Sequence, residues 1–151
     1  MLCPAGVPHA IGPGVLLVEV QEPTDFSVLL EYADFGLRDG HLGLGYDLAL
    51  ECVDRRGWSA QRIAALHGAA GPGRLLPPAA DEFFTADRLR GPVADLDAAF
   101  SVVVVLAGAG TLTGAHDRLT VRRGDTLPVP FAAGPLRLTG EVTAVRLGAA
   151  R

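Results

Sequence analysis

The chain has 151 residues, of which 49% are apolar and 20% are charged, enough to build one or two small domains around a buried core. This apolar content excludes intrinsic disorder, and the longest apolar runs, residues 15–18 and 102–107, are too short to cross a membrane. The formal charge of −4 comes without a basic block, which excludes nucleic acids and membranes as partners. All 13 cationic residues are arginines, so Schiff-base lysine chemistry is excluded as well.

The cysteine content and the first residues indicate an intracellular protein. Cys3 and Cys52 are too few and too far apart for a disulfide framework, so we expect two reduced thiols. Prolines and glycines crowd residues 4–14, where a signal peptide would need a continuous apolar segment. We therefore predict a cytoplasmic location.

The amino-terminal part predicts two strands, at residues 14–21 and 26–32, separated by the turn-forming residues 22–25. In the first of these, Glu19 shares a face with Val15 and Leu17, because side chains alternate along a strand. A carboxylate among apolar neighbours needs a partner or a function. Glu19 is therefore a candidate functional residue.

The central part changes to helical spacing. Apolar residues recur at four-residue intervals in residues 47–56, and a second helix is predicted over residues 59–66, ending before Gly68. Residues 71–78 are rich in glycine and proline and read as a linker. The insert is thus two short helices.

The carboxy-terminal part predicts an all-β domain. Short strands are expected at residues 100–106, 119–122, 126–130, 136–138 and 142–146, separated by turns that contain glycine or proline. This regular spacing is typical of a β-sandwich or a jelly roll. Residues 108–114 are glycine-rich, but no helix follows them, so we expect a hairpin and not a dinucleotide-binding loop. The tripeptide RGD at residues 123–125 is interpreted as a turn and not as an adhesion motif.

The most informative motif is PAGVPH at residues 4–9, which fits the pattern P-x-G-x-x-H. It resembles the second half-motif of the cupin superfamily, whose jelly roll uses the proline and glycine to direct one imidazole toward a metal. Only three residues precede this turn, too few for a strand, so we expect the strands before it to lie outside this sequence.

The amino-acid sequence after this motif resembles the carboxy-terminal portion of the type I mannose-6-phosphate isomerases. Glu19 follows the motif at the family's spacing, Asp25 follows six residues later, and residues 41–42 and 49–50 match a later H-L…A-L pattern. The resemblance implies zinc-dependent aldose–ketose isomerisation of a sugar phosphate, mannose 6-phosphate to fructose 6-phosphate. It also implies that His9 is a zinc ligand and that Glu19 and Asp25 are the catalytic residues.

The resemblance further implies a cupin-type jelly roll with a two-helix insert. It places the closing strands of the catalytic barrel at residues 1–35, the helical insert and linker at 36–76, and a degenerate cupin domain at 77–151. The chain departs from the family in two respects: Leu29 stands where the family has an arginine, and no Q-x-H sequence occurs. The remaining ligands of the one Zn²⁺ are therefore absent from this chain.

Two alternatives stay open beside the isomerase. The chain could be a non-catalytic cupin-like module for sugar binding or assembly, or a truncated fragment that self-associates through an open sheet edge. The expected partner is a small-molecule sugar phosphate. His41, His67 and His116 are interpreted as structural or solvent-facing histidines.

Overall fold

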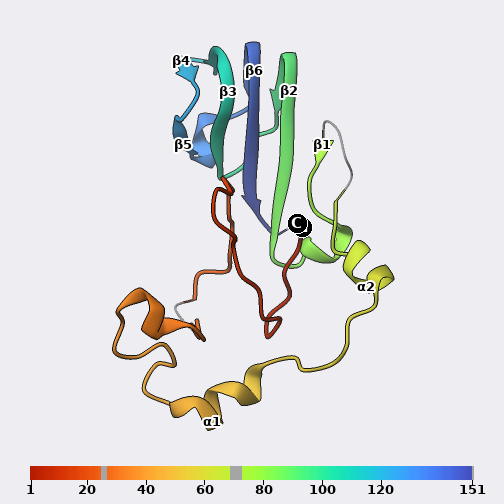
Figure 1. Cartoon of the computed structure of the whole chain (residues 1–151). Coiled ribbons are helices and arrows are strands. Elements are labelled where there is room, and N and C mark those ends of the chain that lie inside the picture. Colours follow the sequence, from red (N-terminus) through yellow and green to blue (C-terminus); the bar gives the residue numbers. More distant parts are fainter. Residues whose placement is uncertain (25–26, 69–72, 151) are drawn as a thin grey trace. The chain divides into compact units, whose positions relative to one another are not determined.

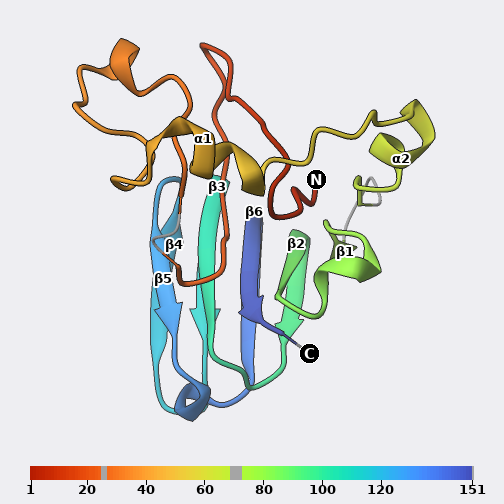
Figure 2. The same ribbon diagram turned by 90° about the horizontal axis from the view of Figure 1, so that it is seen from below.

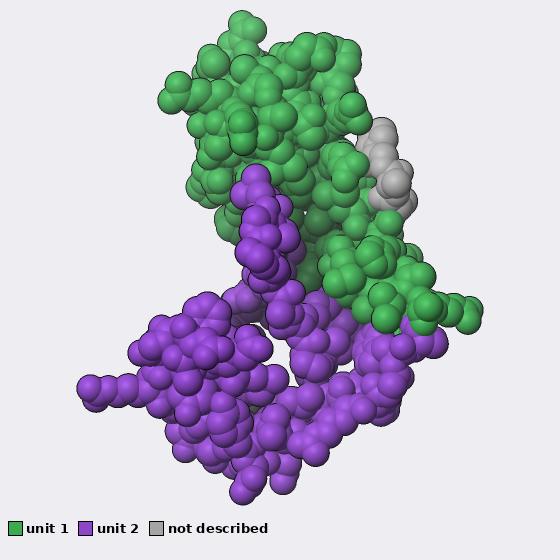
Figure 3. Space-filling model, viewed as in Figure 1, with its two compact units in different colours: residues 1–2, 60–151 green, residues 3–59 purple. Residues whose placement is uncertain are grey.

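A single antiparallel sheet forms most of residues 60–151 (Figures 1 and 2). The computed structural model describes residues 1–24, 27–68 and 73–150. Two compact units can be distinguished in it, one of residues 3–59 and one of residues 1–2 and 60–151 (Figure 3). The strands are β1 (Gly73–Arg74), β2 (Phe84–Leu96), β3 (Ser101–Thr113), β4 (Arg118–Arg122), β5 (Thr126–Val129) and β6 (Leu136–Ala149).

The strand order is β1-β2-β6-β3-β4, and β5 also pairs with β3. Strand β5 covers residues 101–104 of β3 and β4 covers residues 109–113, so together they line one edge of β3. The turn at residues 123–125 joins them, and the Val105 N–H still donates to the Asp125 carbonyl within it. The long strands β2, β6 and β3 form most of the sheet.

The three long strands are irregular at the same level of the sheet. The pairing of β2 with β6 shifts between Gly91 and Val93, and that of β3 with β6 shifts between Val105 and Ala107. Close by, Gly108 and Gly140 have φ angles of 75° and 112°. A Cβ atom on Gly140 would lie 2.8 Å from the Ala109 carbonyl oxygen. Bulges and glycines of this kind bend strands, so the sheet is bent along the row that these bulges and glycines form across β2, β6 and β3.

Residues on both sides of this row of bulges and glycines contribute to the hydrophobic core. Val103, Val105 and Ala144 come from one side, and Leu112 and Leu138 come from the other. All of these side chains are buried, and they form one cluster. The full cluster consists of Leu96, Val103, Val105, Leu112, Val121, Val129, Leu138, Val142 and Ala144. A bent sheet can therefore enclose a core with its own residues.

The carboxy-terminal predictions are largely confirmed. The all-β assignment holds, the strands at 100–106, 119–122 and 126–130 are present, and the turn at 123–125 forms. One prediction was wrong: residues 136–138 and 142–146 belong to the single strand β6, because the irregularity at Gly140 interrupts the pairing without ending the strand. The hairpin predicted at residues 108–114 was also wrong for most of this range, because β3 continues to Thr113 and the chain turns only at residues 114–117.

The two predicted helices are confirmed, as α1 (Gly45–Ala49) with the 3-10 turn η2 (Leu50–Cys52), and α2 (Ala60–Ala64). Further 3-10 turns are η1 (Tyr32–Phe35), η3 (Pro78–Ala80) and η4 (Phe131–Ala133). None of the helices in the described ranges is both long enough and apolar enough to span a membrane.

The two amino-terminal strands are not formed in the described residues. Residues 14–21 have no strand pairing, and within residues 27–32 the Leu29 N–H donates to the Gly40 carbonyl in a loop, at 2.7 Å. A strand needs a neighbour for its backbone groups, and no described segment supplies one here. The domain boundaries at 35/36 and 76/77 stay a prediction.

Gly108 provides a test of the bend. We expect Gly124→Ala, which meets a positive φ of 94° but no neighbouring atom, to lower the free energy of unfolding by about 1–2 kcal/mol. At Gly108 an added methyl group meets a positive φ and also the Glu141 backbone. We therefore expect Gly108→Ala to lower the free energy of unfolding by about 1–3 kcal/mol more than Gly124→Ala does. Urea unfolding of the two variants measures the difference. Equal losses would show that β6 yields freely to the added methyl group.

Candidate functional site

The PAGVPH segment forms a tight turn with a defined role for its glycine. The Val7 N–H donates to the Pro4 carbonyl at 3.2 Å, and Gly6 takes a φ of 78°, as a type II turn requires at its third residue. A Cβ atom on Gly6 would lie 2.6 Å from the Cys52 carbonyl oxygen. The Asp54 N–H also donates to the Gly6 carbonyl, at 2.7 Å. The turn is therefore docked against residues 52–54.

This turn fixes the ring of His9. Nδ1 of His9 lies 3.0 Å from the Val7 carbonyl oxygen and 3.2 Å from Sγ of Cys3. A carbonyl oxygen only accepts, so in this contact Nδ1 carries the proton and donates it. The neutral ring then has a lone pair on Nε2, and metal-binding histidines are commonly oriented in this way by a carbonyl group. His9 as a whole residue is exposed.

Cys3 and Glu19 belong to the same neighbourhood. The Cys3 pKa is raised above its ordinary value, first because the sulfur is partly desolvated and second because of the negative charge of Glu19. Cys3 also lies 3.8 Å from the Val7 carbonyl oxygen, to which its S–H group points. Two residues singled out from the sequence, His9 and Glu19, are thus linked through a third, Cys3.

A complete metal centre is not formed by these residues. Within the described ranges, no group of three or more His, Cys, Asp and Glu side chains is arranged to hold a metal ion. A catalytic zinc site needs about three protein ligands. The third predicted residue, Asp25, lies outside the described residues.

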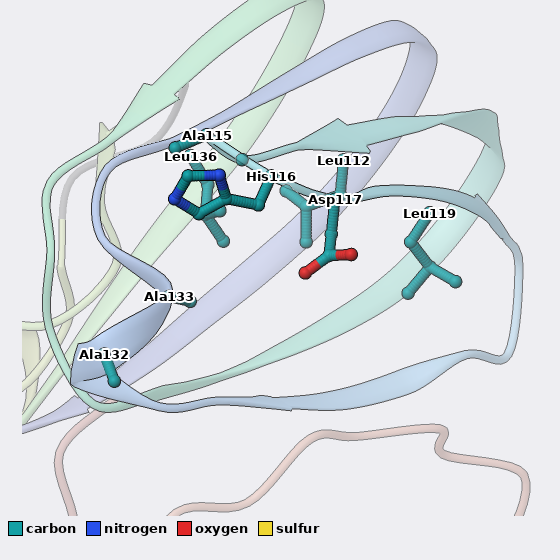
Figure 4. Close-up of a pocket in the computed structure, with 9 residues that line it drawn as sticks. Leu112, Ala115, His116, Asp117, Leu119, Ala132, Ala133 and Leu136 are labelled. Carbon is teal, nitrogen blue, oxygen red and sulfur yellow. The ribbon is translucent and has the colours of Figure 1, made fainter.

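A different site lies on the carboxy-terminal sheet. A pocket of about 160 Å³ is bordered by the β3–β4 hairpin, η4 and the start of β6. Figure 4 shows His116 and Asp117 projecting from the hairpin on the side where Ala132 and Ala133 lie. Leucines supply the apolar part of the lining, namely Leu112, Leu119 and Leu136.

A second hollow, of about 400 Å³, adjoins the first and shares Gly114 and Leu136 with it. Its lining includes Asp97 and the ion pair of Asp95 with Arg137, in which Nε lies 2.6 Å from Oδ1. This pair is exposed, so its contribution to stability is small. Together the two hollows have an apolar floor and a polar rim.

His41 is held by its own loop. Its side chain is 17% exposed, and its ring packs edge-on against those of Tyr32 and Tyr46. Nδ1 lies 2.8 Å from Oδ1 of Asp39, whose pKa is lowered mainly by the hydrogen bond from the His41 backbone N–H. These contacts account for His41 as a structural residue, whereas His67 is exposed and carries no such network.

Sequence reasoning missed two of these features. Cys3 was treated only as a reduced thiol, although its place directly before the motif puts it at the base of the turn that carries His9. His116 was set aside as a loop residue, and its contribution to a pocket depends on η4 and β6, about 15–20 residues later in the chain. The adjacent pair His116 and Asp117 was the one available sequence signal.

The chain has an all-β, cupin-type fold, with one antiparallel sheet and two short helices. Among solved structures, mannose 6-phosphate isomerase from Bacillus subtilis is similar to it with a TM-score of 0.51 at 14% identity, over 69% of this chain and 34% of that chain. The chain therefore spans about a third of that enzyme's length.

Weaker similarities connect the chain to smaller proteins. A cupin protein from Bacteroides fragilis matches with a TM-score of 0.43 at 13% identity, over 55% of this chain and 80% of that one. A cupin-2 domain containing protein from Shewanella frigidimarina matches at 0.39 and 12%, over 59% and 89%. No family model matches the sequence, and no curated protein does.

The raised pKa of Cys3 leads to a prediction about how fast its thiol is alkylated. Glu19→Gln removes the negative charge that disfavours the thiolate, so at a fixed pH below the pKa we expect faster alkylation of Cys3. Peptide mass spectrometry after iodoacetamide treatment measures this rate, with Cys52 as internal reference. Glu22→Gln is the matched control and should leave the Cys3 rate unchanged. An unchanged rate in Glu19→Gln would separate Glu19 from the His9 turn.

Proposed function

We propose that this chain contributes His9 to the zinc site of a mannose-6-phosphate isomerase-like enzyme, which interconverts mannose 6-phosphate and fructose 6-phosphate. The observation that carries the proposal is the type II turn of residues 4–7, which holds His9 with Nδ1 on the Val7 carbonyl and leaves Nε2 for a metal. The similarity of the fold to that of the Bacillus subtilis enzyme supports it.

The donor groups in this neighbourhood are suited to form part of the ligand set of a zinc ion. An imidazole nitrogen is a good zinc ligand, and the Cys3 thiol and the Glu19 carboxylate keep further donors nearby. No Q-x-H sequence occurs in residues 1–151, so these residues supply only part of the ligand set that the resemblance implies. When bound, zinc would supply polarisation of the sugar carbonyl or of its neighbouring hydroxyl.

Glu19 is the proposed acid–base group of this site. Isomerisation moves a proton between carbons 2 and 1 of the sugar while the carbonyl shifts the other way, so no oxidant or reductant is consumed. An exposed carboxylate in the neighbourhood of the His9 turn is suited to accept and return that proton. Asp25, six residues later, is proposed as a second catalytic residue on the strength of the sequence resemblance.

The zinc contribution of His9 can be measured on the chain itself. We expect His9→Ala to weaken zinc binding by at least about tenfold, because it removes the one ligand whose geometry is prepared. A competition titration against a chromophoric chelator gives the affinity, and His67→Ala is the control, since that exposed histidine lies outside the turn. Equal affinities of the two variants would contradict the proposal.

The chemistry requires a second measurement. Incubation of the gene product with Zn²⁺ and mannose 6-phosphate in deuterium oxide should place deuterium on carbon 2. Glu19→Gln should abolish this exchange and retain zinc. Exchange that persists in Glu19→Gln would assign the proton transfer to another group.

A further inference from the structure

We infer that the pocket beneath the β3–β4 hairpin binds a neutral polyhydroxylated ligand of about monosaccharide size. The hairpin holds its shape through the backbone, because the Gly114 N–H donates to the Asp117 carbonyl at 2.9 Å. In the described part of the chain, the side chains of His116 and Asp117 make no hydrogen bond or ion pair. Both side chains border the pocket (Figure 4), so their polar atoms are available to a ligand.

The charge of the lining excludes an anionic ligand. Asp117 borders the first hollow and Asp97 the adjoining one, and the single arginine among their lining residues, Arg137, is already paired with Asp95. A phosphate or carboxylate group would therefore meet like charge without a free cation to offset it. This pocket is consequently unsuited to a sugar phosphate, in contrast to the substrate of the His9 site.

The polar groups match hydroxyls better than an ammonium. A carboxylate such as that of Asp117 accepts hydrogen bonds from hydroxyl groups, and the imidazole of His116 has a ring N–H that donates. Hydroxyl groups are both donors and acceptors, so vicinal hydroxyls can use all of these positions. An ammonium ion would use only the acceptors, so the ring N–H of His116 would take no part in its recognition.

The floor and the volume set the size of the ligand. Leu112, Leu119 and Leu136 offer an apolar surface on which the C–H groups of a sugar ring can pack. The volume of about 160 Å³ is below the range of roughly 300–1,000 Å³ usual for drug-sized ligands, which limits the deeper part to a small molecule. The adjoining hollow, with Thr113 and Asp97, gives room for further hydroxyls.

Ligand-observed NMR on the purified chain tests the site. Saturation transfer is measured with D-mannose, D-fructose and D-glucose as neutral probes, mannose 6-phosphate as the anionic probe and propylamine as the cationic probe. We expect transfer to at least one hexose, weakened at least about tenfold in Asp117→Asn through the loss of a charge-assisted hydrogen bond. His116→Ala should weaken it as well, whereas Asp47→Asn, an exposed carboxylate on α1, should not.

The outcomes separate this site from the zinc site. Binding that survives both His9→Ala and a chelator supports the inference, since neither change touches the hairpin. The inference is overturned if no hexose shows transfer, if Asp117→Asn and His116→Ala bind as well as the parent chain, or if propylamine or mannose 6-phosphate binds more tightly than the neutral hexoses. Thermal melts of each variant show whether the hairpin variants keep the parent fold.

Discussion

The close approach of the β3 and β6 backbones at Gly108 and Gly140 is the constraint on which the carboxy-terminal sheet depends. A side chain at either glycine would press on the backbone of the neighbouring strand, and both residues take positive φ angles that other residues rarely adopt. The strands pass through this row without ending, so one sheet contributes core residues from both of its halves. A straight sheet of the same length would leave one half of these side chains in water.

The pocket follows from the same bend. Beyond the row of glycines, β3 continues to Thr113 and returns as β4, and the hairpin between them forms one wall of the hollow. Leu112 is buried in the core cluster and also borders the pocket, so the floor of the pocket is the end of the core itself. His116 and Asp117 lie in the loop that joins these two strands, and the Gly114–Asp117 backbone hydrogen bond holds the shape of that loop.

The sequence predicted those elements whose information is local. The run of valines at 102–105 and the turn at 123–125 carry strong strand and turn preferences, and both were correct. Residues 14–21 carry the same kind of preference, yet they form no strand because pairing requires a partner segment, which local sequence does not report. The pocket was missed for a related reason, since Asp117 and Ala133 meet only through the tertiary fold.

The candidate sites differ in how much of their chemistry this chain supplies. His9 lies on a docked turn with Nδ1 on the Val7 carbonyl, and a single imidazole cannot hold a catalytic zinc, so the proposed zinc site needs donors beyond the group that His9 supplies. The hairpin pocket is lined entirely by residues of one sheet and its connections, and it needs no metal. The two proposals differ in the charge of the ligand: a sugar phosphate is proposed for the zinc site and a neutral polyhydroxylated ligand for the hairpin pocket, whose lining includes Asp117 and adjoins Asp97.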